Sequence, residues 1–297
     1  MRLCRFGDAR LGLVEHAGVR DVTEALDVLP SYRYPLPARD VLIEHLDQVR
    51  ERVLAAAPAS PLLPLAGVKL LSPVANPGKI VAAPVNYQKH HAEAKEDAQI
   101  HHGNPAHTLT IHQAGLFLKA TSSLVGAGEG IALRMPERRT DHELELAFVI
   151  GKQASGISRH NALNYVAGYA IGLDITIRGP EDRSFRKSPD SYTVLGPWMA
   201  TVDEIPNPGE LDLSLAVNGE TRQASNTRHM ILGVAELIEL ASSFYTLYPG
   251  DVFLTGTPEG VSPIAPGDRV VATIEKIGAM EVQVREVKGR AVEVRSA

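Results

Sequence analysis

The sequence predicts a β-rich α+β protein in which a small N-terminal domain of strands and a helix precedes a larger mixed domain. Three observations lead to this prediction: short apolar runs alternate with turns near the N-terminus, a proline-rich stretch follows at 58–64, and strand-like segments fill most of the remaining chain. We expect the two domains to cover residues 1–70 and 71–297.

The N-terminal domain is predicted from two successive patterns. Residues 1–30 alternate apolar runs with turns, as a small antiparallel sheet does, and apolar residues between Val41 and Leu54 then recur at helical spacing. Pro58, Pro61 and Pro64 cannot continue that helix, because proline lacks the backbone donor that a helix interior needs. The proline-rich stretch is therefore interpreted as a linker.

Strand-like segments dominate the larger domain, at 79–85, 142–151, 211–220, 250–256, 268–278 and 280–294. Asn218-Gly219 predicts a hairpin turn, because both residues tolerate positive φ. Helices are expected around 159–169 and from about 231 to 246. The chain has no GxGxxG motif, P-loop or internal repeat, so a nucleotide-binding α/β fold is not expected.

Composition favours a small-molecule ligand. The chain has 297 residues, enough to bury a core without disulfides or a structural metal, and its net charge of −5 with a pI near 6.1 argues against nucleic-acid or anionic-membrane partners. A single cysteine, Cys4, excludes an internal disulfide, and no apolar run approaches the roughly 20 residues that cross a bilayer. We expect a soluble, cytoplasmic protein without a signal peptide.

Two glutamates are the first candidate metal ligands. In a strand through 141–150, the period of two places Glu143 and Glu145 on one face, with Leu144 and Leu146 on the other. The exposed face of an edge strand would have the same pattern. The apolar residues that follow indicate instead that the strand enters the core.

Asp174 is the third candidate ligand. It ends the apolar run 165–173, where an ionised carboxylate is costly unless it is paired or bound to metal. A salt bridge to Arg178 is the structural alternative. Three carboxylates without a cysteine or a close histidine pair suit Mg²⁺ or Mn²⁺, or else Ca²⁺, rather than zinc.

His90 and Glu93 form a candidate general base. Three residues apart, they would lie on one side of a helical turn, where the carboxylate can orient the imidazole. A base that activates water needs this pairing. A solvated surface pair would have the same spacing.

Seven motifs in order carry a family resemblance. They are Asn86 to Glu93 (N-Y-x-x-H-x-x-E), Phe117-Leu118-Lys119, Glu143-Leu144-Glu145, Asp174, Lys187-Ser188, Leu195-Gly196-Pro197-Trp198 and Thr255-Gly256-Thr257-Pro258-Glu259-Gly260. Together they span about residues 72–285, and the ordered set resembles the fumarylacetoacetate hydrolase family. The resemblance implies the mixed β-sandwich roll of that family's C-terminal domain.

The resemblance also implies roles for particular residues. Glu143, Glu145 and Asp174 would bind the metal, His90 with Glu93 would be the base, and Lys119, Arg178, Lys187 and Thr257 would surround the substrate, with Lys119 taking part in catalysis. Solvated lysines, an Arg178–Asp174 ion pair and a turn role for Thr257 are the alternatives.

Two segments depart from the family pattern. Where members often have Asp, x, Gln after the arginine, this chain has Gly179-Pro180-Glu181, so Glu181 stands where the distal part of the substrate would be contacted. The segment from His91 to Gln113 is long and rich in histidine (His91, His101, His102, His107, His112). We interpret it as a polar lid rather than as a second metal site.

The reaction implied is hydrolysis of a carbon–carbon bond in a 2,4-dioxo acid, of the acylpyruvate or fumarylpyruvate type, through a metal-stabilised pyruvate enolate. The same site would also serve an oxaloacetate-type decarboxylase or a hydratase/isomerase, and a non-catalytic metal-binding protein is the alternative of another class. A homodimer and a role in aromatic catabolism are expected by resemblance.

Overall fold

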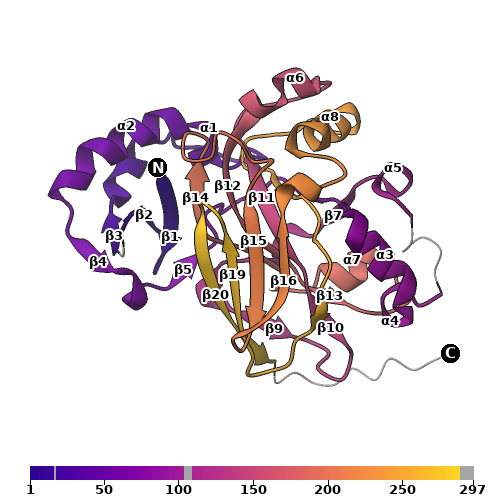
Figure 1. Cartoon of the computed structure of the whole chain (residues 1–297). Coiled ribbons are helices and arrows are strands. Elements are labelled where there is room, and N and C mark those ends of the chain that lie inside the picture. The colour runs from indigo at the N-terminus through magenta and orange to yellow at the C-terminus, as the bar shows by residue number, and fades with distance from the viewer. Residues whose placement is uncertain (17, 104–108, 288–297) are drawn as a thin grey trace.

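The structure is a computed structural model that describes residues 1–16, 18–103 and 109–287 (Figure 1). Its helices are α1 (Val41–Glu44), α2 (Leu46–Ala56), α3 (Gln88–Glu96), α4 (Ala98–His101), α5 (Ile111–Ala114), α6 (Arg159–Ala162), α7 (Arg183–Lys187) and α8 (Val234–Phe244). No helix in the described part of the chain is long and apolar enough to cross a membrane.

A 12-stranded mixed sheet forms the larger layer, in the order β4-β3-β2-β1-β14-β12-β11-β17-β6-β7, with β5 added on β1 and β8 on β14. Its strands are β1 (Arg2–Phe6), β2 (Arg10–Glu15), β3 (Gly18–Asp21), β4 (Leu62–Pro64), β5 (Leu70–Leu71), β6 (Ile80–Ala82), β7 (Phe117–Lys119), β8 (Leu124–Val125), β11 (Leu144–Ile150), β12 (Val166–Asp174), β14 (Thr193–Thr201) and β17 (Val252–Leu254).

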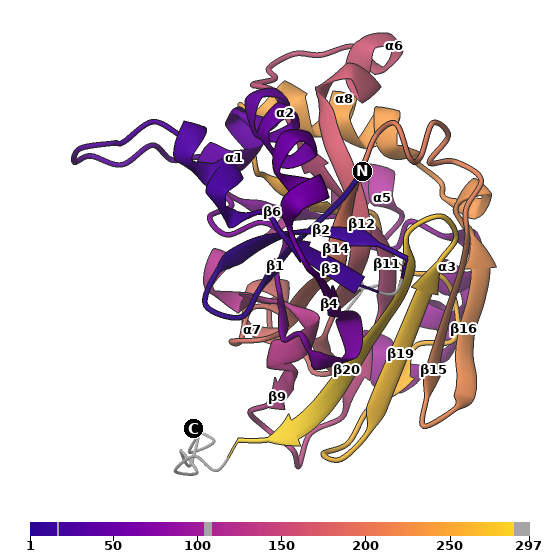
Figure 2. The same cartoon turned by 90° about the vertical axis from the view of Figure 1, so that its left-hand side faces the viewer.

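A five-stranded sheet packs against the central strands of the large one. It contains β16 (Glu220–Asn226), β15 (Asp212–Val217), β19 (Arg269–Ile274), β20 (Gly278–Glu286) and β9 (Ile131–Leu133). Figures 1 and 2 show this sheet beside β11, β12 and β14. The largest apolar cluster joins the two layers, with Phe148 and Trp198 from one and Leu213 and Met280 from the other. This sandwich confirms the predicted β-rich α+β class.

A third, small sheet joins β13 (Thr176–Ile177), β10 (Thr140–His142) and β18 (Ser262–Pro263). β10 runs directly into β11, and β13 directly follows β12, so the small sheet extends one end of the central β11–β12 pair. The candidate metal ligands lie at this junction.

The N-terminal strands are continuous with the large sheet, because β1 pairs with β14 through Leu3 and Met199. The predicted helix is present but is interrupted at His45, between α1 and α2. Val49 and Val53 of α2 belong to an apolar cluster of the N-terminal segment. The domain boundary near residue 70 stays a prediction.

The helix expected at 159–169 is wrong in its second half. Helical turns end at Tyr165, and Val166–Asp174 is the buried strand β12, paired on both sides with β11 and β14. Gly168 allows this close pairing, since a Cβ there would lie 2.5 Å from the carbonyl oxygen of Ala200. Pairing on both sides outweighs the local helical pattern.

Two other local predictions agree with the structure. The expected C-terminal helix is α8, and Asn218-Gly219 joins β15 to β16 with φ values of 52° and 86°. The strand predicted over 280–294 is observed as β20 up to Glu286, and its last part lies outside the described residues.

Candidate metal centre and active site

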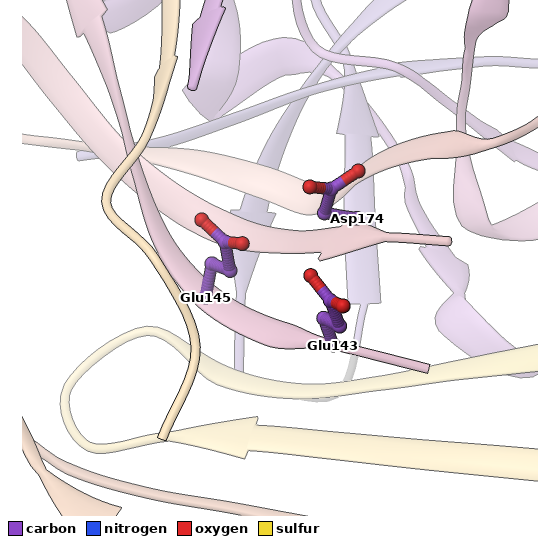
Figure 3. A group of neighbouring side chains, drawn as sticks. All are labelled: Glu143, Glu145 and Asp174. Atoms are coloured by element: carbon purple, nitrogen blue, oxygen red, sulfur yellow. The ribbon is translucent and has the colours of Figure 1, made fainter. Parts of the chain in front are cut away.

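Glu143, Glu145 and Asp174 lie together at the junction of β11 and β12 (Figure 3). The antiparallel register sets Leu144 opposite Leu173, and the backbone amide of Asp174 donates to the carbonyl oxygen of Glu143 at 3.0 Å. One carboxylate oxygen from each residue lies within 4.8 Å of the others, about twice the metal–oxygen distance of 2.1 to 2.6 Å for Mg²⁺ or Ca²⁺.

All three carboxylates are buried, and β11 is a central strand between β12 and β17, so the edge-strand alternative is wrong. Burial and the neighbouring charges of Asp174 and Glu143 raise the pKa of Glu145 well above its usual value. The backbone amide of Gly256 donates to its Oε2 atom and opposes this rise. A divalent cation would relieve the repulsion between Glu145 and the two neighbouring carboxylates, so the arrangement fits a site for a hard cation.

Two lysines contact the carboxylates. Lys187 Nζ lies 2.8 Å from Glu143 Oε2 and 2.6 Å from Asp174 Oδ2. Lys119 Nζ donates to Asp174 Oδ1 and, at 2.7 Å, to the carbonyl oxygen of Tyr192. Both lysines are buried, so the solvated alternative is wrong, and burial lowers the pKa of Lys119 against the opposing effect of Asp174.

Arg178 does not pair with Asp174. Its Nε atom donates to Asp141 Oδ2 at 2.7 Å and its Nη2 atom to Glu143 Oε1 at 2.9 Å. Burial alone would raise the pKa of Glu143, but Lys187 and Arg178 together hold it well below its usual value. Lys187 and Arg178 therefore favour the ionised form of Glu143.

His90 is buried on α3, and its Nδ1 atom lies 2.8 Å from Glu93 Oε2. The other oxygen, Oε1, accepts a hydrogen bond from the backbone amide of Gly260 at 2.9 Å. A carboxylate at Nδ1 holds the proton there, which leaves Nε2 able to accept one. The solvated-pair alternative is wrong for His90.

A cavity joins the two groups of residues. Six of the predicted residues line it: His90, Glu143, Glu145, Arg178, Lys187 and Thr257. Glu93 contacts the lining residue His90, and Asp174 contacts the lining residue Lys187. Lys119 lies one step further away, because it donates to Asp174. Ala94 and Ile100, from the segment interpreted as a lid, also line the cavity. His107 lies outside the described residues, and the lid itself stays a prediction.

Glu181 is directed elsewhere. Both of its carboxylate oxygens accept hydrogen bonds of 2.8 Å from Arg138, and it is not among the cavity-lining residues. Arg138 engages the carboxylate in this structure, and contact between Glu181 and the substrate stays a prediction.

Sequence reasoning missed Arg183, Arg186 and Gln223. Arg183 and Arg186 line the cavity from α7. Their position just before Lys187 in the sequence could have indicated that they lie near the site. The guanidinium carbon of Arg183 lies 5.8 Å from the Phe117 ring centroid. Gln223, on β16, donates to Thr257, and no pattern in the neighbouring sequence indicates this contact.

Comparison with known proteins supports the resemblance. Residues 79–285 match the family model described as fumarylacetoacetate (FAA) hydrolase C-terminal, which is more than half of the chain. The chain belongs to the fumarylacetoacetate hydrolase family. Within this family, the predicted fold is confirmed by solved structures that superpose on almost the whole chain.

Three relatives bear on the chemistry. The chain is 60% identical over 287 residues to maleylpyruvate hydrolase from Aquipseudomonas alcaligenes, covering 97% of this chain and 100% of that protein. Maleylpyruvate hydrolase from Sphingobium sp. SYK-6, solved with manganese(II) ion and pyruvate, is 38% identical with a TM-score of 0.81, covering 97% and 100%. A mitochondrial oxaloacetate tautomerase from Rattus norvegicus is 36% identical over 244 residues, covering 78% and 74%.

Proposed function

We propose that this protein is a divalent-metal-dependent hydrolase that cleaves a carbon–carbon bond in a 2,4-dioxo acid, with maleylpyruvate as the first substrate to test. The observation that carries the proposal is one cavity lined by a buried carboxylate pair and by a histidine that a second carboxylate orients. Acylpyruvates and fumarylpyruvate belong to the same substrate class.

Glu143, Glu145 and Asp174 would hold Mg²⁺ or Mn²⁺, since the site offers oxygen ligands alone. When bound, the cation would bind the 1-carboxylate and 2-keto oxygens of the substrate and stabilise the negative charge that develops there. Thr257 lines the same cavity, where its hydroxyl would donate a hydrogen bond to the substrate.

His90 is the general base. Its Nε2 atom takes a proton from water while Glu93 stabilises the imidazolium, and the hydroxide adds to the 4-carbonyl carbon. The C3–C4 bond then breaks, its electron pair passes to C3, and a proton is added there. The products are pyruvate and a carboxylic acid, so water supplies both the hydroxyl group and the proton.

Positively charged side chains offset the negative charges of the carboxylates and of the substrate. Lys119 and Lys187 lie against the carboxylates, where they reduce the repulsion that an anionic substrate would meet. Arg178 keeps Glu143 ionised. Arg183, which lines the same cavity beside Phe117, is a cation suited to the distal carboxylate of a dicarboxylic substrate.

The second candidate is tautomerisation or decarboxylation of oxaloacetate, favoured by the similarity to the rat oxaloacetate tautomerase. Oxaloacetate has the same 1-carboxylate and 2-keto group, so the same cavity would bind it. Only proton transfer to or from C3, or loss of carbon dioxide, would be required.

A substrate panel tests the proposal. Maleylpyruvate, fumarylpyruvate, acetylpyruvate and oxaloacetate would be assayed with Mg²⁺ and with Mn²⁺, with pyruvate release as the measurement. We expect the highest kcat/KM for a dioxo acid, and no turnover after chelation of the metal. Turnover of oxaloacetate alone would favour the second candidate. Homodimer formation, cytoplasmic location and a role in aromatic catabolism stay predictions.

A further inference from the structure

Gln223 makes a set of hydrogen bonds that the proposed mechanism does not use. It lies on β16, 1% exposed, between the strand that carries the glutamates and the loop that carries Thr257. Its Oε1 atom lies 3.0 Å from the backbone nitrogen of Leu144, and its Nε2 atom lies 2.8 Å from Thr257 Oγ1 and 2.9 Å from the carbonyl oxygen of Pro258.

The orientation of this amide follows from its partners. The backbone amide of Leu144 can only donate, so the Gln223 atom that faces it is the oxygen. The carbonyl oxygen of Pro258 can only accept, so the atom that faces it is the NH₂ nitrogen. Both ends agree, and Gln223 therefore donates to Thr257.

His142 holds the same oxygen from the other side. Its Nδ1 atom lies 3.1 Å from Gln223 Oε1, and its Nε2 atom lies 2.8 Å from Ser262 Oγ. Because Oε1 is an acceptor, Nδ1 carries the hydrogen, and Nε2 accepts from the Ser262 hydroxyl. On Gln223, two donors at Oε1 and two acceptors at Nε2 fix the amide against rotation.

The fixed Gln223 amide determines how the Thr257 hydroxyl can form hydrogen bonds. One of its lone pairs accepts from Gln223, so its own hydrogen is available to another acceptor, and Thr257 is one of the residues that line the cavity. We propose that Gln223 is a positioning residue that fixes the Thr257 hydroxyl as a donor toward an oxygen of the substrate's 2-oxo acid group. This inference rests on the proposed function, because that function supplies the anionic acceptor.

Gln223 also links the Thr257 hydroxyl to the strand that carries two of the candidate metal ligands. Leu144, which donates to the Gln223 oxygen, stands between Glu143 and Glu145 on β11. One side chain thus contacts both the backbone between two carboxylates and the hydroxyl that faces the substrate. The hydroxyl is positioned relative to the carboxylates without a direct contact between them.

Gln223→Glu tests the donor, because it keeps an oxygen for Leu144 but replaces the NH₂ group with a second acceptor. The Thr257 hydroxyl would then donate to the introduced carboxylate and present a lone pair to the substrate. We expect KM and the calorimetric Kd for pyruvate with Mn²⁺ to rise roughly 10-fold or more, the scale of a lost hydrogen bond to a charged group, with kcat within about threefold.

A double-mutant cycle separates positioning from a general structural effect. Thr257→Val should raise KM and Kd similarly, Thr257→Ser should remain near wild type, and Gln223→Glu should add nothing to Thr257→Val. Gln223→Met, which removes the donor without adding a charge, should weaken pyruvate binding in the same direction if the glutamate variant does not fold. Gln283→Glu, on an exposed position of β20, is the matched control and should change nothing.

Additive effects of the Gln223 and Thr257 changes, or unchanged pyruvate affinity in folded Gln223→Glu and Gln223→Met, would overturn this inference alone. Wild-type protein that neither binds pyruvate with Mn²⁺ nor hydrolyses any dioxo acid would overturn it together with the proposed function. The wild-type measurement therefore distinguishes the two failures.

Discussion

The backbone amide of Gly260 donates a 2.9 Å hydrogen bond to the Oε1 atom of Glu93, 167 residues earlier in the chain. The other oxygen of Glu93 faces Nδ1 of His90, so the loop after β17 supports the proposed base through Glu93. Since Thr257 belongs to the same loop, one short segment contacts both the base and the proposed substrate oxygen site. This connection gives the first two predictions.

His90→Ala should lower kcat by roughly 10²-fold or more, the usual scale for a general base, with Mn²⁺ affinity near the wild-type value. The control is His91→Ala, since His91 is the adjacent histidine on α3 and does not line the cavity. Steady-state kinetics and calorimetry make the comparison. Loss of activity in the His91 variant but not in the His90 variant would show that the base is assigned to the wrong histidine.

Gly260→Ala should lower both stability and kcat. Its φ of +94° is unfavourable for alanine, and a Cβ there would lie 2.1 Å from the carbonyl oxygen of Arg222, so the backbone must shift and the hydrogen bond from Gly260 to Glu93 is disturbed. Gly267→Ala is the matched control, because its φ of +96° is similar but no atom lies within 4 Å of its Cβ. Both variants should lose roughly 1 kcal/mol or more of stability, and only Gly260→Ala should lose activity. Equal kinetics in the two variants would argue against support of Glu93 by this amide.

Glu145→Gln and Asp174→Asn should each abolish measurable Mg²⁺ and Mn²⁺ binding together with turnover. The physical reason is that each change removes a charged ligand from a site of three. Asp251→Asn is the control, since Asp251 is equally buried but pairs with Lys79 away from the trio. It should lower the melting temperature without changing metal affinity, whereas metal affinity retained in both ligand variants would exclude this site.

Stabilisation by metal should grow with pH. The raised pKa of Glu145 means that folded protein without metal binds a proton more tightly than unfolded protein does, so this group costs stability as pH rises from its unfolded pKa toward its folded pKa. Mn²⁺ must displace that proton, so its affinity increases over the same range. The increase in melting temperature on adding Mn²⁺ should therefore be larger at about pH 8 than at about pH 5.5. An equal increase at both values, or a larger one at the lower pH, would contradict a raised pKa at the metal site.

Local patterns predicted much of the site. The period of two placed Glu143 and Glu145 on one face, and the apolar run before Asp174 predicted a buried carboxylate that needs a partner. The spacing of His90 and Glu93 predicted their contact, because it is set within one helical turn. Each of these relationships depends on a few neighbouring residues.

Relationships between distant segments were not predictable in the same way. Arg178 pairs with Asp141 and Glu143 rather than with Asp174, and Glu181 pairs with Arg138, because tertiary packing decides which charges meet. Gln223 approaches Thr257 only after two sheets have packed. The segment 166–169 failed as a helix for the same reason, since strand pairing on both sides is a tertiary effect.

Arg183→Gln should distinguish dicarboxylic from monocarboxylic substrates. Arg183 lines the cavity beside Phe117, on the helix that also carries Lys187, so its guanidinium group can bind the distal carboxylate that maleylpyruvate has and acetylpyruvate lacks. We expect KM for maleylpyruvate to rise roughly 10-fold or more, the scale of a hydrogen bond between charged groups, while KM for acetylpyruvate changes little. Arg269→Gln, which removes an exposed arginine paired with Glu281, is the control for a general loss of positive charge and should affect neither substrate. Equal increases in KM for both substrates would show that Arg183 acts on the pyruvoyl end or on the fold, and recognition of the distal carboxylate would then fall to Arg186, the other lining arginine of α7.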